Sequence, residues 1–352
     1  MKKFIITLLT ILLVTTGCSQ SKEKPSSTPS VPSGSLRVHF IDVGQADAIL
    51  VQRGEDSMLV DAGNNDDGEK IIRYLSQQGI KKLSVVMGTH PHEDHIGGLD
   101  DVIKYFPVER VYLPKVNHTT KTYRDVLTAI KNKNLKATAA FGGQTFNLED
   151  ARVEILAPNS SEYKELNDYS IVSKISFGDT AFLLTGDAEM LSEQEMLEKG
   201  FDLEANVLKV GHHGSHSSTG DKFLRAVNPQ MAVISVGANN DYGHPHRETL
   251  QRLNDSKIKV YQTSQQGTIV MTSDGKRVEV QGEITEAEKA VPKESTANVG
   301  NDGKGLIKGN INKNGDKIYH LPGQQNYDRT KPEVWFKTEQ EAQAAGFRRA
   351  SR

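Results

Sequence analysis

Cysteine and tryptophan are nearly absent from this sequence of 352 residues, which holds one of each, Cys18 and Trp335. A single cysteine rules out a disulfide within the chain. Neither sign of charge is in excess: 43 Lys and Arg oppose 45 Asp and Glu, so the net charge of -2 neither indicates nor excludes a polyanionic partner. The length suffices for one large domain or two smaller ones with a real core.

Long hydrophobic runs are missing as well. The run from Phe4 to Val14 is about half as long as a bilayer-spanning helix, and no segment after residue 18 is apolar enough to span a membrane. Met1-Lys2-Lys3 precedes the run and Thr15-Thr16-Gly17-Cys18 follows it. This order is typical of a secretory signal peptide at residues 1–18.

The end of this segment resembles the lipobox of bacterial lipoproteins. The resemblance implies that Cys18 becomes the lipidated first residue of the mature protein, although Thr15 stands where such proteins usually have a large aliphatic residue. We therefore expect a lipid anchor at the extracellular face of a bacterial cell membrane, with plain secretion as the alternative. A lipidated Cys18 leaves no free thiol, so any metal site must use histidine and oxygen ligands.

Composition divides the remaining chain into segments. Residues 19–35 are rich in serine, proline and lysine and predict a flexible tether. Residues 284–303 lose apolar periodicity and predict a linker before a small module at 304–352. This module holds ten Lys and Arg against five Asp and Glu, a net charge of +5. Such a charge would attract a polyanion weakly, whether nucleic acid, wall polymer or lipid head groups.

Between tether and linker, residues 36–283 alternate short apolar strands with helices, which implies sheets covered by helices. The predicted strands are 36–43, 48–52, 58–63, 83–90, 152–157, 171–177, 181–185, 206–210, 231–236, 258–262 and 267–272. The predicted helices are 96–105, 122–132, 189–198 and 247–255.

Residues 89–98 read THPHEDHIGG. A solvated polar turn is one interpretation, but four ligand-type residues in six positions, behind a buried strand and before two glycines, favour a metal site. His90 and His92 point to the same side of an extended chain. The spacing suits two neighbouring metals, one held by these two histidines and one by Asp94 and His95.

Three other apolar strands also end in ligand-type residues. Asp187 follows a strand in FLLTGDAE, and a carboxylate there can bridge two cations. His212, His213 and His216 follow another in NVLKVGHHGSHSS. Asp61 ends MLVD, where a loop residue or helix cap is the alternative interpretation.

These motifs resemble a known family. THPHEDH is similar to the HxHxDH signature of the metallo-beta-lactamase superfamily, and LVDAG, LLTGDAE and VGHHGS are similar to its accompanying motifs. With HFIDVGQADAILV and YGHPH, they resemble the extracellular hydrolase domain of ComEC-type competence proteins over residues 36–283. The resemblance implies an α/β fold, an αββα sandwich with metals at one edge between the sheets. The final module resembles the small "sunset" domain of some secreted nucleases.

The resemblance also implies roles for single residues. His90 and His92 would bind one metal, Asp94 and His95 the other, and Asp187 would bridge them. The later histidine of the family aligns best with His212, with His213 possible, and Asp61 would orient a ligand histidine. Asn167, in LNDYSIV, stands where the superfamily usually has a histidine. ComEC-type relatives likewise carry asparagine at this position. Its carbonyl oxygen is a weaker ligand, which admits Mn²⁺ beside Zn²⁺.

The resulting hypothesis is a metal-dependent phosphodiesterase that cleaves extracellular DNA with water activated by two divalent ions, without a nucleotide cofactor. Asp94 would serve as a catalytic ligand. His244 and His246, in YGHPH, would hold a phosphate oxygen or protonate the leaving group, or else merely order a loop. Ser215 and His216 would bind substrate, or the serines nearby would cap a helix starting near Thr219.

Two other functions fit the same sequence. One is hydrolysis of a small or wall-linked phosphoester or of a lactone, because fold alone does not select a substrate. The other is a non-catalytic lipoprotein that captures DNA and passes it to an import channel, since this chain has no channel of its own.

Overall fold

The computed structural model describes residues 34–281, 307–312, 315–322, 327, 329–337, 341–342 and 345–350. The chain divides into two compact units between Gln281 and Gly282, and each is described by itself. The predicted signal peptide with Cys18, the tether up to residue 33 and the linker lie outside the described residues.

The first unit contains two large sheets. One has eight strands, in the order β15-β14-β1-β2-β3-β4-β5-β6. Their bounds are β15 Val278–Val280, β14 Ile269–Ser273, β1 Leu36–Phe40, β2 Ile49–Arg53, β3 Asp56–Val60, β4 Leu83–Met87, β5 Val108–Pro114 and β6 Ala137–Ala140. The other has seven strands, in the order β13-β12-β11-β10-β9-β8-β7. Their bounds are β13 Lys259–Gln262, β12 Met231–Ile234, β11 Val207–Lys209, β10 Thr180–Leu184, β9 Val172–Phe177, β8 Ala151–Ala157 and β7 Thr145–Leu148.

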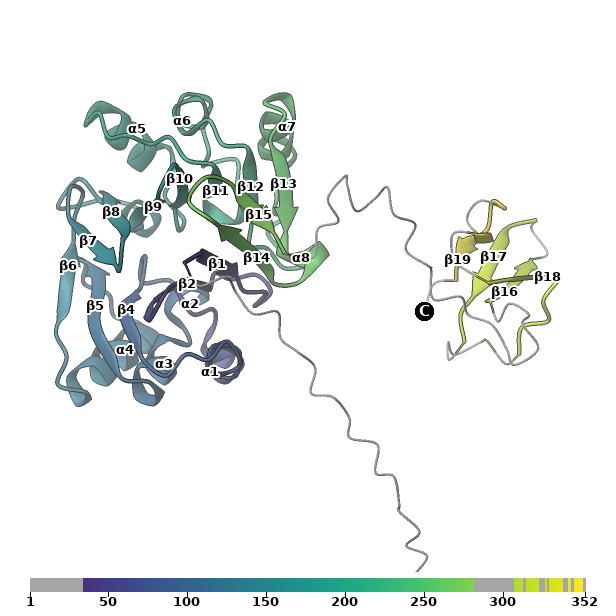
Figure 1. The fold of residues 1–352 in the computed structure, drawn as a ribbon, viewed down its shortest axis with the longest axis horizontal. Helices are drawn as coiled ribbons and strands as arrows, with labels where there is room; N and C mark the ends of the chain where they lie inside the picture. The colour runs from purple at the N-terminus through teal and green to yellow at the C-terminus, as the bar shows by residue number, and fades with distance from the viewer. Residues whose placement is uncertain are drawn as a thin grey trace, which may run out of the picture. The chain divides into compact units, whose positions relative to one another are not determined.

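Helices cover the outer face of each sheet (Figure 1). The longer ones are α1 Gly68–Gln77, α3 Leu99–Tyr105, α4 Lys121–Asn132, α5 Met190–Glu198, α6 Asp221–Val227 and α7 Arg247–Asp255. Short turns are η1 Asn65–Asp67, α2 Glu93–Ile96, η2 Leu166–Tyr169, η3 His212–Gly214 and α8 Thr263–Gln266.

Three hydrophobic clusters fill the interfaces between the layers of the first unit. Phe40 of the first sheet and Phe182 of the second belong to one cluster between the sheets. A second cluster joins the first sheet to α1, α3 and α4, and a third joins the second sheet to α5, α6 and α7. Burial of these apolar faces is the main force that holds the layers together. The predicted αββα sandwich is confirmed.

Every predicted strand and helix has a counterpart, although the ends differ by a few residues. The predicted helix at 96–105 is divided, because Gly97 and Gly98 separate α2 from α3. A Cβ on Gly97 would lie 2.2 Å from the main-chain carbon of Asn64, and one on Gly98 would lie 2.5 Å from the carbonyl oxygen of Ala62. The two glycines therefore permit a close approach of the chain that no side chain would allow.

In the first unit, the helix α1 and the strands β5, β6, β7 and β15 were not predicted, nor were the short turns η1, η2, η3 and α8. Glu109 and Arg110 interrupt the apolar pattern of β5, and β6 consists of alanine and threonine only. The apolar pair Ile71 and Leu75, buried on one face of α1, is a helical signal that the sequence did contain.

Strand direction brings the candidate ligands to one edge. β3 and β4 run parallel in the first sheet, as do β10, β11 and β12 in the second, so their carboxyl ends lie together within each sheet. The sheets join at this edge, where the backbone N–H of Ile171 donates to the carbonyl of Thr89 at 2.9 Å.

The second unit contains a four-stranded sheet, in the order β18-β16-β17-β19. The strands are β16 Ile307–Ile311, β17 Lys317–His320, β18 Val334–Phe336 and β19 Arg348–Arg349. Phe336, Phe347 and Tyr319 form its small core. Among the described residues of either unit, no helix has the length and hydrophobicity to cross a membrane.

Candidate metal centre

Asp61, directly after β3, holds the imidazole of His95. Its φ of 59° lies in the left-handed region and its side chain is buried. The backbone N–H of Thr89 donates to Oδ1 at 2.7 Å, the Thr89 hydroxyl donates to Oδ2 at 2.7 Å, and His95 Nδ1 lies 2.7 Å from Oδ2. With Nδ1 occupied, His95 presents Nε2 to the edge of the sheets, an arrangement typical of metal-binding histidines.

Asp94, His95, Asp187 and His213 form a compact cluster around that nitrogen. One ligand atom from each lies within 4.8 Å of the others. His95 Nε2 is 3.2 Å from Asp187 Oδ1, and His213 Nε2 is 3.2 Å from Asp94 Oδ2 and 3.6 Å from Asp187 Oδ2. The two carboxylates and two imidazoles form a donor set suited to a divalent transition metal.

The structure places His213, rather than His212, in this cluster. His213 is buried and its Nδ1 lies 2.9 Å from the carbonyl oxygen of Ser235, which directs Nε2 toward the acids. His212 Nδ1 lies 3.0 Å from Glu189 Oε1, and its Nε2 is 3.9 Å from Asp187 Oδ2. The sequence favoured His212; the geometry favours His213, because both residues adopt left-handed φ values that turn adjacent rings in different directions.

A second group lies around His90. His90 Nε2 is 2.9 Å from His92 Nδ1 and 4.0 Å from Asp187 Oδ2. Asn167, in η2, donates from Nδ2 to Glu189 Oε1 at 3.1 Å, which places it beside His212. The Asp187 carboxylate therefore lies between the His90 group and the His95 group, as a bridging ligand requires.

Three buried ligand-type atoms support metal binding. Asp187 Oδ1 and His95 Nε2 lie 3.2 Å apart without hydrogen-bonding geometry, and neither atom has a hydrogen-bond partner among the described residues. Asn167 Oδ1 is buried and also without a partner in that part of the chain. Unpaired buried polar atoms are costly, so the adjacent atoms of Asp187 and His95 indicate a place where a cation would satisfy them.

The electrostatics agree with this assignment. Burial disfavours the charged form of His95, but the carboxylates of Asp187, Asp61 and Asp94 outweigh burial and raise its pKa well above the usual value. Burial likewise opposes charge on Asp187, yet His95 and His213 hold the pKa of its carboxyl well below the usual range. Positive charge is favoured where these groups meet, and a bound cation would replace the proton on His95.

Sequence reasoning missed Asp47 and Lys209, which form a fully buried ion pair behind the cluster. Lys209 Nζ lies 2.9 Å from Asp47 Oδ2 and donates to the carbonyl of Val210 at 2.9 Å. Asp47 Oδ1 is 3.5 Å from His213 Nδ1, and its backbone N–H donates to the carbonyl of Asp94. The sequence signal that could have revealed this pair is the single lysine within the otherwise apolar run VLKVG.

The histidines of YGHPH lie at the rim of the site. The ring centroid of His244 is 5.4 Å from that of His212 and 4.7 Å from that of His246. His246 Nδ1 accepts the backbone N–H of His216 at 3.0 Å, and its own backbone N–H donates to the carbonyl of Gly214. Burial, with His212 and His246 nearby, lowers the pKa of His244 to about 4.

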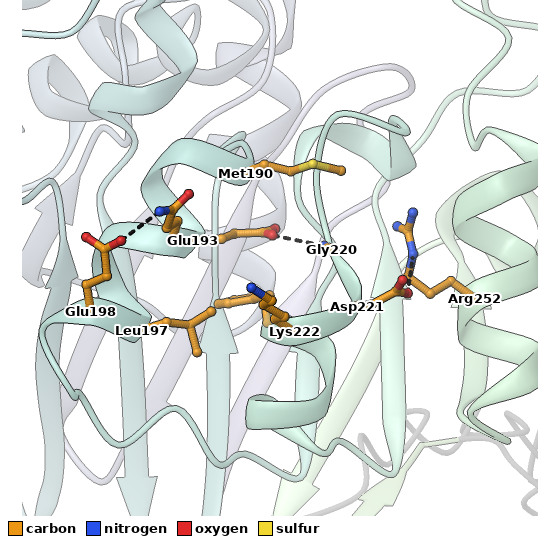
Figure 2. Close-up of a pocket in the computed structure, with 10 residues that line it drawn as sticks. Met190, Glu193, Leu197, Glu198, Gly220, Asp221, Lys222 and Arg252 are labelled. Carbon is orange, nitrogen blue, oxygen red and sulfur yellow. Dashed lines mark hydrogen bonds and ion pairs between the residues drawn. The ribbon is translucent and has the colours of Figure 1, made fainter.

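The loop after β11 is held by internal contacts. The Ser215 carbonyl accepts the Thr249 hydroxyl at 3.0 Å, and the Ser218 hydroxyl donates to the carbonyl of Gly211 at 2.7 Å. Glu193, rather than a serine, accepts the N–H groups of Thr219 and Gly220 before α6. Figure 2 shows Glu193 pointing at Gly220 in a pocket between α5 and α6, and none of the residues that line this pocket belongs to the ligand cluster.

Comparison with known proteins places the first unit in a family. The model of the metallo-beta-lactamase superfamily matches residues 41–238, which is more than half of the chain. A model described as ArfC matches residues 289–349, while the resemblance of this module to a sunset domain stays a prediction.

Two curated relatives match about two thirds of this chain. ComE operon protein 3 of Bacillus subtilis is 34% identical over 66% of this chain and 32% of its own length. Recombination protein 2 of Haemophilus influenzae is 30% identical over 70% of this chain and 30% of its own length. The chain thus spans about a third of each relative.

Among solved structures, the metallo-beta-lactamase fold protein YhfI from Bacillus subtilis aligns with 68% of this chain and 100% of its own, with a TM-score of 0.46 at 15% identity. The match to the family model, together with the competence-related relatives, confirms the resemblance first seen in the motifs. The chain belongs to the metallo-beta-lactamase superfamily, and its first unit is similar to a part of these competence-related relatives.

Proposed function

We propose that this protein is a phosphodiesterase that cleaves extracellular DNA with two divalent cations. The position of Asp187 carries the proposal. Its Oδ1 lies 3.2 Å from His95 Nε2, and its Oδ2 lies 3.6 Å from His213 Nε2 and 4.0 Å from His90 Nε2. One carboxylate thus reaches both histidine groups, as a two-metal hydrolytic site requires.

The residues divide between two cations. His90, His92 and the Asn167 carbonyl would hold the first, Asp94, His95 and His213 the second, and Asp187 both. The histidine, carboxylate and amide donors suit Zn²⁺ or Mn²⁺. When bound, such cations lower the pKa of a water molecule and neutralise charge on a phosphoryl group. Elemental analysis of the purified protein tests which metal is present and in what ratio.

The rim histidines supply the remaining chemistry. With a pKa of about 4, His244 is neutral at physiological pH, and its imidazole would donate a hydrogen bond to a phosphoryl oxygen. His246 Nδ1 accepts the N–H of His216, so the neutral ring carries its proton on Nε2. We assign a hydrogen bond from that N–H to the leaving oxygen, which takes its proton from water, and we assign contacts with flanking phosphates to Ser215 and His216.

Two observations support DNA as the substrate. Recombination protein 2 carries recombination in its name, and Competence protein ComA of Neisseria gonorrhoeae, 28% identical over 68% of this chain, carries competence; both are processes that handle DNA. The module at 304–352 has a net charge of +5, from ten Lys and Arg less five Asp and Glu, and would add attraction for a polyanion.

The test is a cleavage assay after chelation and readdition of Mn²⁺ or Zn²⁺. We expect the wild type and the control Asp125→Asn, which alters an exposed ion pair on α4, to degrade labelled DNA. We expect His92→Ala and Asp187→Asn to lose at least about 100-fold in rate. Cleavage by the wild type no faster than that of His92→Ala would refute the nuclease proposal. Turnover of small phosphoesters or lactones but not of DNA would show that the protein is instead a hydrolase of those compounds.

The location is a further part of the proposal. We infer that lipidated Cys18 anchors the enzyme at the extracellular face of the cell membrane, where DNA would arrive from outside. Labelled palmitate should enter the wild-type protein in the membrane fraction, and Cys18→Ser should be unlabelled and released. Label and membrane association that persist in Cys18→Ser would contradict the anchor.

A further inference from the structure

We propose that Tyr242 is a stacking platform for an unpaired nucleobase beside the metal centre, so that the preferred substrate is single-stranded DNA. This inference rests on the proposed phosphodiesterase function and specifies its substrate class. It concerns the first residue of the motif YGHPH, to which the sequence analysis gave no role.

The rings between Tyr242 and the metal cluster stack one on the next. The ring centroids of Tyr242 and His244 are 5.7 Å apart with an angle of 24° between the planes. The centroids of His244 and His213 are 6.4 Å apart with an angle of 25°. The series therefore begins at a buried histidine of the cluster and ends at a tyrosine that is 69% exposed.

The backbone that carries Tyr242 is held in place. The side-chain carbonyl of Asn240 accepts the backbone N–H of Tyr242 at 3.2 Å and that of His244 at 3.0 Å. Its amide donates to the carbonyls of His244, at 2.6 Å, and Gly237, at 3.0 Å. Between them, Gly243 takes a left-handed φ of +71°. An exposed ring on a fixed backbone loses little conformational entropy when it binds a ligand.

The chemistry of an exposed aromatic ring selects unpaired bases. Every nucleobase has a π face, so stacking on tyrosine tolerates any sequence. A base inside a duplex is already stacked on its neighbours and is not available to a side chain. A strand whose phosphate is at the cations could place a neighbouring base on Tyr242 only if that base is unpaired.

The test compares Tyr242→Ala, Tyr242→Phe and a matched control, Tyr105→Ala, which removes a tyrosine that is 62% exposed on α3. Each variant is assayed for binding, by fluorescence anisotropy without divalent metal, and for cleavage with metal restored. The probes are a single-stranded oligonucleotide and an oligomer of the same length built from abasic units. The abasic oligomer keeps the phosphates but offers no base to stack.

We expect Tyr242→Ala to weaken binding and to raise KM for the single-stranded oligonucleotide by about 5- to 150-fold, the loss of one base–aromatic stack. Tyr242→Phe and Tyr105→Ala should behave as the wild type, and all variants should treat the abasic oligomer alike. An equal loss on both probes, or no loss on either, would overturn the platform. Base-dependent binding through Tyr242 without cleavage by the wild type would instead refute the proposed nuclease and leave the platform standing.

Discussion

Replacing Lys209 with methionine should destabilise the first unit strongly, because it leaves the Asp47 carboxylate buried without a counter-charge. The two side chains are at most 1% exposed and their charged atoms are 2.9 Å apart. At an effective dielectric constant of about 20, two unit charges at that distance attract by roughly 6 kcal/mol, much of which desolvation offsets. Removal of one partner from such a pair costs about 3–5 kcal/mol.

A double-mutant cycle isolates the interaction. Asp47→Asn combined with Lys209→Met removes both charges, so we expect the double variant to lose much less stability than the sum of the single losses. The control Lys104→Met breaks a surface pair in which the lysine is 56% exposed, and should cost less than about 1 kcal/mol.

Urea unfolding of the chelated protein is the assay. Far-ultraviolet circular dichroism suits it, because the long helices α1, α4, α5 and α7 belong to the first unit. Tryptophan fluorescence does not, because Trp335, the only tryptophan, belongs to the second. A loss in Lys209→Met no larger than in Lys104→Met, or single losses that add fully in the double variant, would refute the assignment of a coupled buried pair.

Three further predictions concern the same unit. Burial raises the pKa of Glu193 to about 7 from its usual 4.5, so its ionisation disfavours the folded state, and stability should fall as pH rises from 4.5 to 7. Relative to Glu193→Gln, the wild type should lose about 3 kcal/mol over that range in urea unfolding; parallel pH profiles would contradict this. Asp61→Asn should weaken metal binding by about 10- to 100-fold in a chelator competition, whereas Asp125→Asn should not; equal affinities would show that Asp61 does not orient His95. His213→Ala should bind one metal equivalent fewer than the wild type by elemental analysis. A loss only in His212→Ala would show that His212 is the ligand, as the family resemblance implied.

Much of the fold could be predicted because buried strands are short apolar runs bounded by glycine and acidic residues. The run LSVVM of β4 is buried along its whole length and reads as a strand without help from its neighbours. β6 could not be predicted in the same way, since ATAA has no strong preference and three of its four residues are exposed. Its strand conformation comes from parallel pairing with β5, which is a tertiary interaction.

The site shows the same division. His90, His92, Asp94 and His95 are nearly contiguous, so their chemistry and their likeness to a family signature could be recognised from the sequence alone. The Lys209–Asp47 pair could not, because Asp47 lies between β1 and β2 of the first sheet, Lys209 ends β11 of the second, and they meet only when the two sheets pack together.

The sequence by itself therefore determined the fold class and the ligand types, through contiguous patterns of polarity and metal-binding residues. Only the tertiary structure decided between His212 and His213. The two residues are adjacent and chemically identical, so no pattern distinguishes them. The left-handed backbone at both positions and the carbonyl of Ser235 direct one ring to the acids and leave the other beside Glu189. The role proposed for Tyr242 also follows only from the fold, which stacks this loop tyrosine on His244 at the rim of the metal centre.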